Sequence, residues 1–561
     1  MKPIIYQVFT RLFGADSLEP APNGDKHQNG CGTMADFSVK ALGAIRSLGA
    51  THIWYTGIIE HATTTNFSTF GIIPDHPGVV KGLAGSPYAI KDYYDVDPDL
   101  STKVDERRKE FLNLVRRTHR AGLKVVIDFV PNHVARQYHS DCCPEGTEDL
   151  GVGDRTDWHF YADNNFYYCP GQQFAPQFPL DDVKIGAYIE NPARATGNDC
   201  FSPNPSRDDW YETVKLNYGI DYTGGHVCHF NPVPTTWKKM VQILLYWAAT
   251  GIDAFRCDMA EMVPCEFWHW AIPQVKASYP RIEFIAEVYD PQQYRHYIHH
   301  GHFDYLYDKV GLYDTLRGVI GGQSASCITS AWQAVDDINE HMLQFLENHD
   351  EQRIASDFFC GSAIKGRPAL LVSALMRKSP FMVYFGQELG ERGMDAEGFS
   401  GRDGRTTIFD YWTINSIRRW RNGGKFGKDL LTKEEVELQT YYTKVLNLCN
   451  SERALSEGSF YDIMYANYDN PLMDTNRQYA FLRYTDGELL LIIANFSDDD
   501  TLSSVLIPTH AFEHLGLPKE MTTTCAKDLL SGSTFTIPFA PYTNIPLKLP
   551  AQSGVIIKIK I

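Results

Sequence analysis

Apolar residues recur along this chain in two alternating patterns. Short, mostly apolar runs, such as residues 4–9 and 125–130, are typical of strands that are buried on both faces of a sheet. Between such runs stand longer segments whose apolar residues are spaced by three and four, as in residues 37–48 and 105–121, which is typical of helices. Because parallel strands need a crossover between them, this alternation predicts a parallel sheet covered by helices.

Eight strands of this kind are predicted in the first two thirds of the chain. They are residues 4–9, 51–56, 125–130, 251–258, 283–289, 304–307, 343–350 and 380–386. Strands separated mostly by helix-length segments predict an α/β fold, a closed (β/α)8 TIM barrel. The alternative is an open, doubly wound sheet, but no G-x-G-x-x-G follows the first strand, so we expect no dinucleotide or other organic cofactor.

The alternation lapses in two places. Residues 134–234 are rich in Gly, Pro, Asn, Asp and Tyr, and a structureless segment of that length is unusual inside a compact domain, so we predict an inserted subdomain after strand 3. Near the end, the apolar segments 479–484 and 489–494 flank Asp486-Gly487, a hairpin turn signal. The predicted domains are residues 1–133 with 235–454 for the barrel, 134–234 for the insert, and 455–561 for a C-terminal antiparallel β-sandwich.

Composition narrows the class of protein and its partners. The 561 residues are 43% hydrophobic and 22% charged, as in globular proteins of more than one domain. With 52 basic and 69 acidic residues the net charge is −17, which argues against nucleic acid or an anionic membrane as the main partner. No apolar run approaches the roughly 20 residues of a membrane span, and the first residues lack the apolar region of a secretory signal. The 12 cysteines form no C-x-x-C pair, so we expect reduced thiols and a cytoplasmic location, and leave the oligomeric state open.

Polar residues stand at the ends of four predicted strands, where a parallel barrel would bring them to one mouth. Arg256 and Asp258 are two residues apart, so on a strand their side chains point to the same side, and the arginine favours the ionised carboxylate. A purely structural ion pair would explain Arg256 and Asp258 taken alone, but it does not explain polar residues at the ends of four strands. The residues at these ends are Asp128, His133, Arg256, Asp258, Glu287, His349 and Asp350.

Three of these residues are carboxylic acids that could act together. If Asp258, Glu287 and Asp350 lie close together they cannot all ionise, because like charges raise the pKa of a neighbour. One carboxyl group that attacks and another that keeps a proton for the leaving oxygen are what the cleavage of a glycosidic bond requires.

Four motifs give the chain a family resemblance. They are Asp128-Phe129-Val130-Pro131-Asn132-His133, residues 251–258, Ala286-Glu287-Val288 and Glu347-Asn348-His349-Asp350. On these motifs the chain resembles the α-amylase family of glycoside hydrolases (family 13), and the resemblance extends over the barrel, the insert and the C-terminal β domain. It implies a retaining enzyme that cleaves α-1,4-linked glucans or maltooligosaccharides through a covalent glycosyl-enzyme intermediate.

The resemblance also implies the catalytic roles. Asp258 would be the nucleophile and Glu287 the general acid and then the base. Asp350 would bind sugar hydroxyls more tightly in the transition state than in the ground state. For a retaining enzyme we expect the carboxyl groups of Asp258 and Glu287 to lie about 5–5.5 Å apart, whereas roughly 6.5–9.5 Å would indicate inversion.

The remaining site residues are expected to bind the sugar or a metal ion. Tyr88 would stack on the sugar ring, and His133 and His349 would donate hydrogen bonds to its hydroxyls. Arg256 would orient Asp258, and Asp128 would shape the site. The resemblance implies Ca²⁺ with Asn132 as a ligand, because an amide oxygen is a hard ligand; the alternative is that Asn132 holds the turn at the strand end without a metal.

One departure from the family leaves the reaction open. Many α-amylases have a Lys-His pair after the nucleophile, where this chain has Glu261 and Met262. A glucanotransferase, a maltosyltransferase or a sugar isomerase of the same family is therefore an alternative. An alternative of another class is a catalytically inactive carbohydrate-binding protein, but such proteins usually lack a catalytic carboxylate, and all three candidates are present here.

Overall fold

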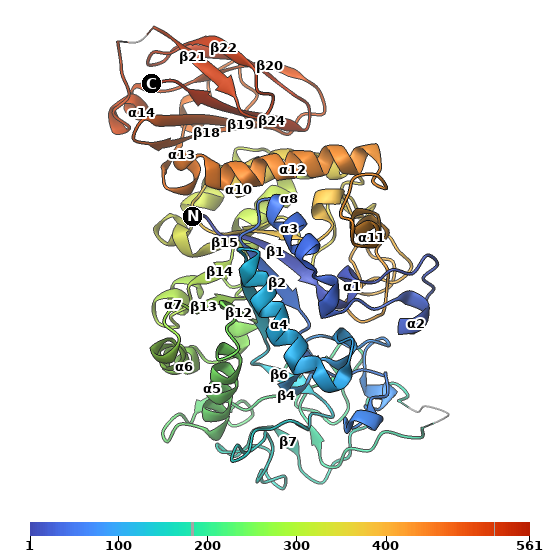
Figure 1. Cartoon of the computed structure of the whole chain (residues 1–561). Coiled ribbons are helices and arrows are strands. Elements are labelled where there is room, and N and C mark those ends of the chain that lie inside the picture. Colours follow the sequence, from blue (N-terminus) through green and yellow to red (C-terminus); the bar gives the residue numbers. More distant parts are fainter. Residues whose placement is uncertain (181–184, 521) are drawn as a thin grey trace.

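A closed barrel of eight parallel strands forms the centre of the computed structural model, which describes residues 1–180, 185–520 and 522–561 (Figure 1). The strands are β1 (Ile4–Phe9), β2 (His52–Thr56), β5 (Lys124–Phe129), β12 (Ala254–Cys257), β13 (Glu283–Ala286), β14 (Tyr305–Tyr307), β15 (Met342–Phe345) and β16 (Phe381–Tyr384). Neighbours in the chain are neighbours in the barrel, and β16 closes it by pairing with β1. The predicted (β/α)8 fold is confirmed.

Apolar side chains fill the interior of the barrel. They form a separate buried cluster, drawn mainly from the strands: Ile5, Trp54, Val126, Ala254, Ile285, Tyr307, Leu343, Phe345 and Met382, together with Tyr313. The alternate side chains of the same strands pack outward against the helices in the main core. Burial on both faces explains why these strands appear in the sequence as continuous apolar runs.

Helices cover the outside of the barrel. The bounds of those that follow the strands are α3 (Val39–Ser47), α4 (Arg107–Arg120), α5 (Thr235–Ala248), α6 (Cys265–Ser278), α7 (Tyr294–His299), α8 (Asp314–Ile320), α9 (Cys327–Gln333), α10 (Arg367–Leu375), α11 (Asn415–Arg421) and α12 (Lys433–Ser451). Two of these helices begin at a side chain that caps the N-terminus. Ser38 accepts from the backbone N–H of Ala41 at α3, and Thr432 forms a capping box with Glu435 at α12. None of the described helices combines the length and apolar character that a membrane crossing needs.

Short strands build the segment inserted after β5. In it β6 (His133–Ala135) pairs with β9 (Thr213–Lys215), β7 (Tyr168–Cys169) with β8 (Ala193–Arg194), and β10 (Ile220–Asp221) with β11 (Val227–Cys228), all antiparallel. Figure 1 shows β6 and β7 below the barrel, with β4 (Ile90–Val96), which pairs with β3 (Ile59–His61), close by. The predicted limits of this subdomain, residues 134–234, stay a prediction.

Antiparallel sheets form the C-terminal region, at the opposite end of the molecule from the insert (Figure 1). One sheet contains β17 (Ser459–Asp462), β18 (Gln478–Thr485), β19 (Glu488–Asn495), β24 (Ser553–Ile559), β21 (Thr523–Asp528) and β22 (Thr534–Pro538), in that order. A second pairs β20 (Thr501–Leu506) with β23 (Asn544–Leu549). Thr485 pairs with Glu488 across the turn, so the predicted hairpin is confirmed, and the region fits a β-sandwich. The remaining short helices are α1 (Thr10–Phe13), α2 (Lys26–Asn29), α13 (Arg453–Ser456) and α14 (Thr509–His514).

Candidate active site

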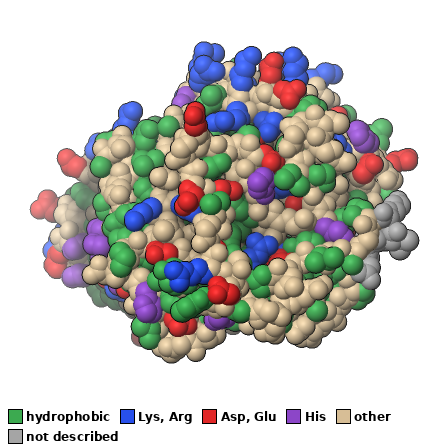
Figure 2. Space-filling view, turned by 90° about the horizontal axis from the view of Figure 1, so that it is seen from below, with side chains coloured by type: hydrophobic (Ala, Val, Ile, Leu, Met, Phe, Trp, Pro, Cys, Tyr) green, Lys and Arg blue, Asp and Glu red, His purple; other side chains and the backbone are tan. Residues whose placement is uncertain are grey.

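A cavity of about 550 Å³ opens at the mouth of the barrel, on the side of the insert. Figure 2 shows the molecule from this end, with side chains of both charges and histidines around a hollow near its middle. Six of the predicted site residues line the cavity: Tyr88, His133, Asp258, Glu287, His349 and Asp350. Asp128 and Arg256 are buried and contact the carboxyl group of Asp258 or the guanidinium that holds it, and Asn132 lies outside the cavity lining.

The register of two neighbouring strands brings the two key carboxyl groups side by side. Cys257 pairs with Ala286 at the ends of β12 and β13, and Asp258 and Glu287 follow directly. The fully buried guanidinium of Arg256 binds both carboxyl groups. Its Nη1 lies 2.7 Å from Asp258 Oδ1, and its Nη2 lies 2.7 Å from Glu287 Oε2. One cation therefore fixes the relative position of two acids from adjacent strands; the expected spacing of about 5–5.5 Å between them stays a prediction.

Protons are retained in this cluster near neutral pH. Burial, reinforced by Glu287, raises the pKa of Asp350 to about 7. Burial also raises the pKa of Asp258 well above its usual value; Arg256 opposes this rise, and Glu287, Asp128 and Asp350 add to it. As expected, Arg256 lowers the pKa of Asp258 and so favours the carboxylate, but burial has the larger effect. A cluster of carboxyl groups that shares a proton can supply both a proton donor and a carboxylate.

Glu287 is held on both of its carboxyl oxygens. Oε2 accepts from the backbone N–H of Met259 at 2.9 Å and forms an ion pair with Arg256, and Oε1 accepts from the hydroxyl of Tyr289 at 2.6 Å. Met259 adopts a left-handed conformation, with φ of 44°, in the turn that follows Asp258. Glu261 accepts from the backbone N–H groups of Tyr289 and Asp290, at 3.0 and 3.1 Å, so it fastens the turn after Glu287.

His349 and Tyr88 form one side of the cavity. Their rings stack with centroids 5.1 Å apart, and the Tyr88 hydroxyl lies 2.6 Å from His349 Nε2. Gln7 Nε2 lies 2.9 Å from the other ring nitrogen, and Asp350 Oδ2 lies 3.1 Å from His349 Nε2. Burial, together with Arg256, lowers the pKa of His349 well below its usual value, so this histidine is neutral and offers one donor.

Asp128 lies under Arg256. Its Oδ2 accepts from Trp54 Nε1 at 2.9 Å, and its Oδ1 lies 3.5 Å from Arg256 Nη1. Burial raises the pKa of Asp128 to about 6. Since it does not line the cavity, it shapes the site through Arg256.

The surroundings of Asn132 do not fit a calcium ion. The amide oxygen accepts from Lys215 Nζ at 2.8 Å, and the same ammonium lies 2.6 Å from Asp199 Oδ1. Calcium takes 6–8 oxygen ligands at distances of about 2.3–2.6 Å, whereas the ligand expected here is already bound to a cation. At a separation of about 4 Å and an effective dielectric constant of about 20, a divalent ion and an ammonium would repel each other by roughly 8 kcal/mol.

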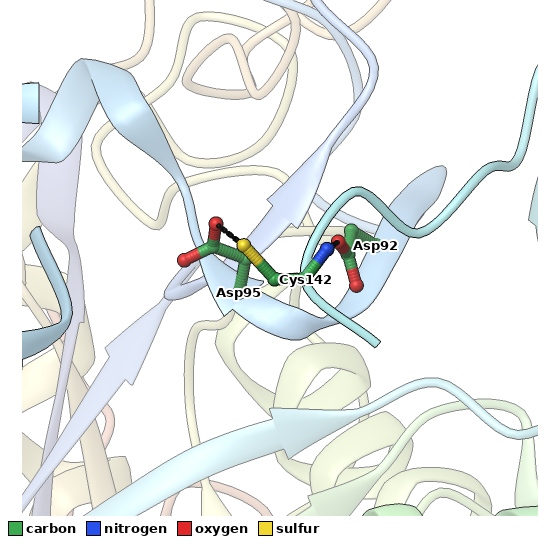
Figure 3. Close-up of side chains that lie close together, drawn as sticks. All are labelled: Asp92, Asp95 and Cys142. Atoms are coloured by element: carbon green, nitrogen blue, oxygen red, sulfur yellow. Dashed lines mark hydrogen bonds between the residues drawn. The ribbon is translucent and has the colours of Figure 1, made fainter. Parts of the chain in front are cut away.

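A group of potential metal ligands lies elsewhere, where the insert meets β4: Asp92, Asp95 and Cys142 (Figure 3). The thiol of Cys142 donates to Asp95 Oδ2 at 2.9 Å and its backbone N–H donates to Asp92 Oδ2 at 3.0 Å. Arg107 binds Asp95 through Nε at 3.0 Å. Burial and Asp95 raise the pKa of Cys142 to about 12, so it is a thiol rather than a thiolate ligand. These contacts indicate a hydrogen-bonded junction.

Several residues that line the cavity were not predicted. They are Lys81, Trp210, Glu212, Tyr289, Lys309 and Phe409, with others. Lys81 Nζ lies 2.9 Å from Glu212 Oε1, which joins the loop before β4 to the insert. Only Tyr289 carried a usable signal, since it stands two residues after Glu287. The others lie in loops or in the short helical turn Lys309–Tyr313, where no periodicity marks them.

Acidic side chains gathered around one arginine at the mouth of a (β/α)8 barrel are an arrangement typical of enzymes that cleave glycosidic bonds. The comparisons agree with this class. The model of the alpha-amylase catalytic domain matches residues 20–409, and the chain belongs to the α-amylase family.

The relatives named below share no more than 25% of their aligned residues with this chain. Alpha-amylase MalA of Haloarcula japonica is 23% identical over 507 residues, which cover 89% of this chain and 56% of that protein, so this chain spans little more than half of that relative. An alpha-1,4-glucan:maltose-1-phosphate maltosyltransferase of Picrophilus torridus is 25% identical over 255 residues, 42% of this chain and 31% of that protein. The structure of a maltogenic alpha-amylase, AmyB of Thermotoga neapolitana, has a TM-score of 0.62 at 19% identity, covering 100% of this chain and 99% of that one, and shows the shared fold.

Proposed function

We propose that this chain is a retaining glycoside hydrolase that cleaves α-1,4-linked glucans or maltooligosaccharides. One observation carries the proposal: the guanidinium of Arg256 binds the carboxyl groups of Asp258 and Glu287 together, 2.7 Å from each, and Asp350 lines the same cavity. The family of the chain and the names of its relatives support an α-glucan as the substrate.

The geometry supports a double displacement. Glu287 gives its proton to the glycosidic oxygen while a carboxylate oxygen of Asp258 attacks the anomeric carbon, so the bond to the leaving sugar breaks and an ester to Asp258 forms. Glu287, now ionised, takes a proton from water, whose oxygen displaces Asp258 and restores both groups. Asp350 binds hydroxyls of the distorted ring, and Tyr88 covers its face.

Glu287→Gln tests the acid–base role. The amide cannot donate a carboxyl proton, so hydrolysis of maltoheptaose should fall by about 10²–10⁴-fold, while binding of the oligosaccharide persists. Glu283→Gln is the matched control, because Glu283 stands at the opposite end of the same strand, next to Lys124 and His52, and it should keep full activity. Equal losses in the two variants, or an active Glu287→Gln, would refute the assignment.

Transfer is the alternative reaction of the same site. The intermediate can pass to a sugar hydroxyl instead of water, and Glu261 and Met262 replace the pair that many α-amylases have after the nucleophile. The maltosyltransferase relative favours this alternative, and a sugar isomerase shares the chemistry. Products longer than maltoheptaose would identify transfer, and shorter products alone would identify hydrolysis. An inactive carbohydrate-binding protein would bind maltoheptaose without forming either.

We also propose a cytoplasmic location with an α-glucan, rather than nucleic acid or a membrane, as the partner. All twelve cysteines are free thiols in the structure, as in proteins of reducing compartments, and the net charge is −17. Titration of the protein unfolded without reductant should find twelve thiols; fewer would indicate an oxidising compartment.

A further inference from the structure

The orientation of the Asn132 amide is fixed by partners of known polarity. Its oxygen faces the ammonium of Lys215, which can only donate, and its nitrogen donates to the carbonyl oxygen of Gly197 at 2.8 Å. The same nitrogen lies 3.1 Å from His133 Nδ1. His133 Nδ1 must therefore accept, so the proton of the neutral ring is on Nε2.

Lys215 is built into the fold at this point. On β9 it pairs with His133 on β6, so the strand register places the lysine beside the histidine that lines the cavity. The side chain is buried, its ammonium lies 2.6 Å from Asp199 Oδ1, and it stands over the Tyr222 ring at 5.4 Å. The ion pair and the aromatic face stabilise the charge of this buried ammonium.

We propose that Lys215 takes the place of the calcium ion expected at Asn132 and, through Asn132, positions His133 at the wall of the cavity with the proton of its ring on Nε2. The part of this inference that concerns sugar binding rests on the proposed function; the part that concerns the cation does not. Because the ammonium belongs to the chain, the site forms whenever the chain folds, whatever the concentration of free metal ion.

Thermal unfolding with and without Ca²⁺ tests whether the ammonium of Lys215 replaces the metal ion. The intact protein should show the same unfolding temperature in EDTA and in 1 mM Ca²⁺. Lys215→Ala should lower the unfolding temperature. Because this change frees the oxygens of Asn132 and Asp199, Ca²⁺ should raise the unfolding temperature of the variant, whereas it does not raise that of the intact protein. Destabilisation of the intact protein by EDTA, reversed by Ca²⁺, would overturn the proposal, as would a Lys215→Ala variant that does not respond to Ca²⁺.

Lys239→Ala is the matched control. Lys239 is also a buried lysine at the junction of barrel and insert, and its ammonium donates to Asn165 Oδ1 at 3.0 Å and to the backbone of Asp149 at 2.8 Å. Its replacement should lower the unfolding temperature without a Ca²⁺ response. A Ca²⁺ response of equal size in both variants would show a non-specific effect and would overturn the proposal.

The positioning role has its own signature. In the ¹⁵N NMR spectrum of histidine-labelled protein, His133, assigned with a His133→Gln variant, should show a protonated Nε2 and a bare Nδ1. Lys215→Met, which removes the donor and lets the Asn132 amide turn, should change that pattern and raise KM for maltoheptaose severalfold, whereas Lys239→Met should change neither. An unchanged His133 pattern in folded Lys215→Met would overturn the role. Neither the NMR spectrum nor the Ca²⁺ response depends on turnover of a substrate. These two measurements therefore test the role of Lys215 even if the proposed reaction is wrong.

Discussion

The hydroxyl of Tyr289 donates a hydrogen bond of 2.6 Å to Oε1 of Glu287, the oxygen that Arg256 does not bind. Glu261 holds the backbone of Tyr289 by accepting from its N–H at 3.0 Å. Glu287 is thus fixed from two sides, by Arg256 from within the barrel and by Tyr289 from the cavity. A rigidly held acid suits catalysis, because small errors in the position of a proton donor cost rate.

Tyr289→Phe should lower kcat for maltoheptaose by about tenfold, equivalent to about 1.4 kcal/mol, with little change in KM. The ring stays in place and only the hydrogen bond to Glu287 is lost. Steady-state kinetics measure the effect. Tyr297→Phe is the control, because the Tyr297 hydroxyl donates to the carbonyl oxygens of Glu261 and Val263 and does not touch Glu287. A Tyr289→Phe enzyme with unchanged kcat would mean that Arg256 and Met259 suffice.

Lys81→Met should change the preference for chain length. The ion pair of Lys81 with Glu212 joins two walls of the cavity, so its loss should let longer chains enter. We expect the ratio of kcat/KM for maltoheptaose to that for maltotriose to rise by about fivefold, equivalent to about 1 kcal/mol. Lys103→Met, a change at an exposed lysine, should leave the ratio as it is. A ratio that stays constant in Lys81→Met would contradict a role for the pair in limiting length.

Glu60→Gln should stabilise the protein more at high pH than at low pH. Glu60 is 1% exposed, and in the described part of the chain neither of its carboxyl oxygens has a hydrogen-bond partner. Burial, reinforced by Asp92, raises the pKa of Glu60 to about 9. The folded state therefore keeps a proton that the unfolded state releases, so stability is lost as the pH rises from the unfolded pKa towards the folded one, by up to about 1.4 kcal/mol per pH unit.

Thermal unfolding at pH 5, 7 and 8.5 checks this dependence. The advantage of Glu60→Gln over the parent should grow across the series, because glutamine does not titrate. Glu106→Gln, at an exposed position, should follow the parent throughout. An advantage that is the same at pH 5 and pH 8.5 would show that Glu60 does not retain its proton in the folded state.

The barrel was predictable because its strands are buried on both faces and so appear as continuous apolar runs. Their ends were less predictable: residues 283–289 and 343–350 were expected as strands, whereas β13 ends at Ala286 and β15 at Phe345. The polar residues that follow belong to turns at the barrel mouth. The helix expected over 105–121 begins at Arg107, after a short 3₁₀ turn over Val104–Glu106.

The acids of the site were predictable for the same reason as the barrel, since Asp258 and Glu287 directly follow β12 and β13, and Asp350 stands five residues after the end of β15. Lys81, Glu212 and Lys215 were not, because they lie in loops or short strands of the irregular segments. Only the folded chain brings Lys81 and Glu212 to the cavity and Lys215 to Asn132. The protonation of the cluster also needed the structure. From the sequence, Arg256 has one neighbour in Asp258, whereas in space it binds Glu287 as well.

The most direct test of the account is to trap the covalent intermediate on Asp258. A 5-fluoro-α-glucosyl fluoride forms the glycosyl ester quickly and releases it slowly, and peptide mass spectrometry then locates the added mass. We expect a single label, attached to the carboxyl group of Asp258 in the peptide that contains it, and no label in Asp258→Asn. A label on Glu287, Asp350 or another side chain, or inactivation without any label, would contradict it.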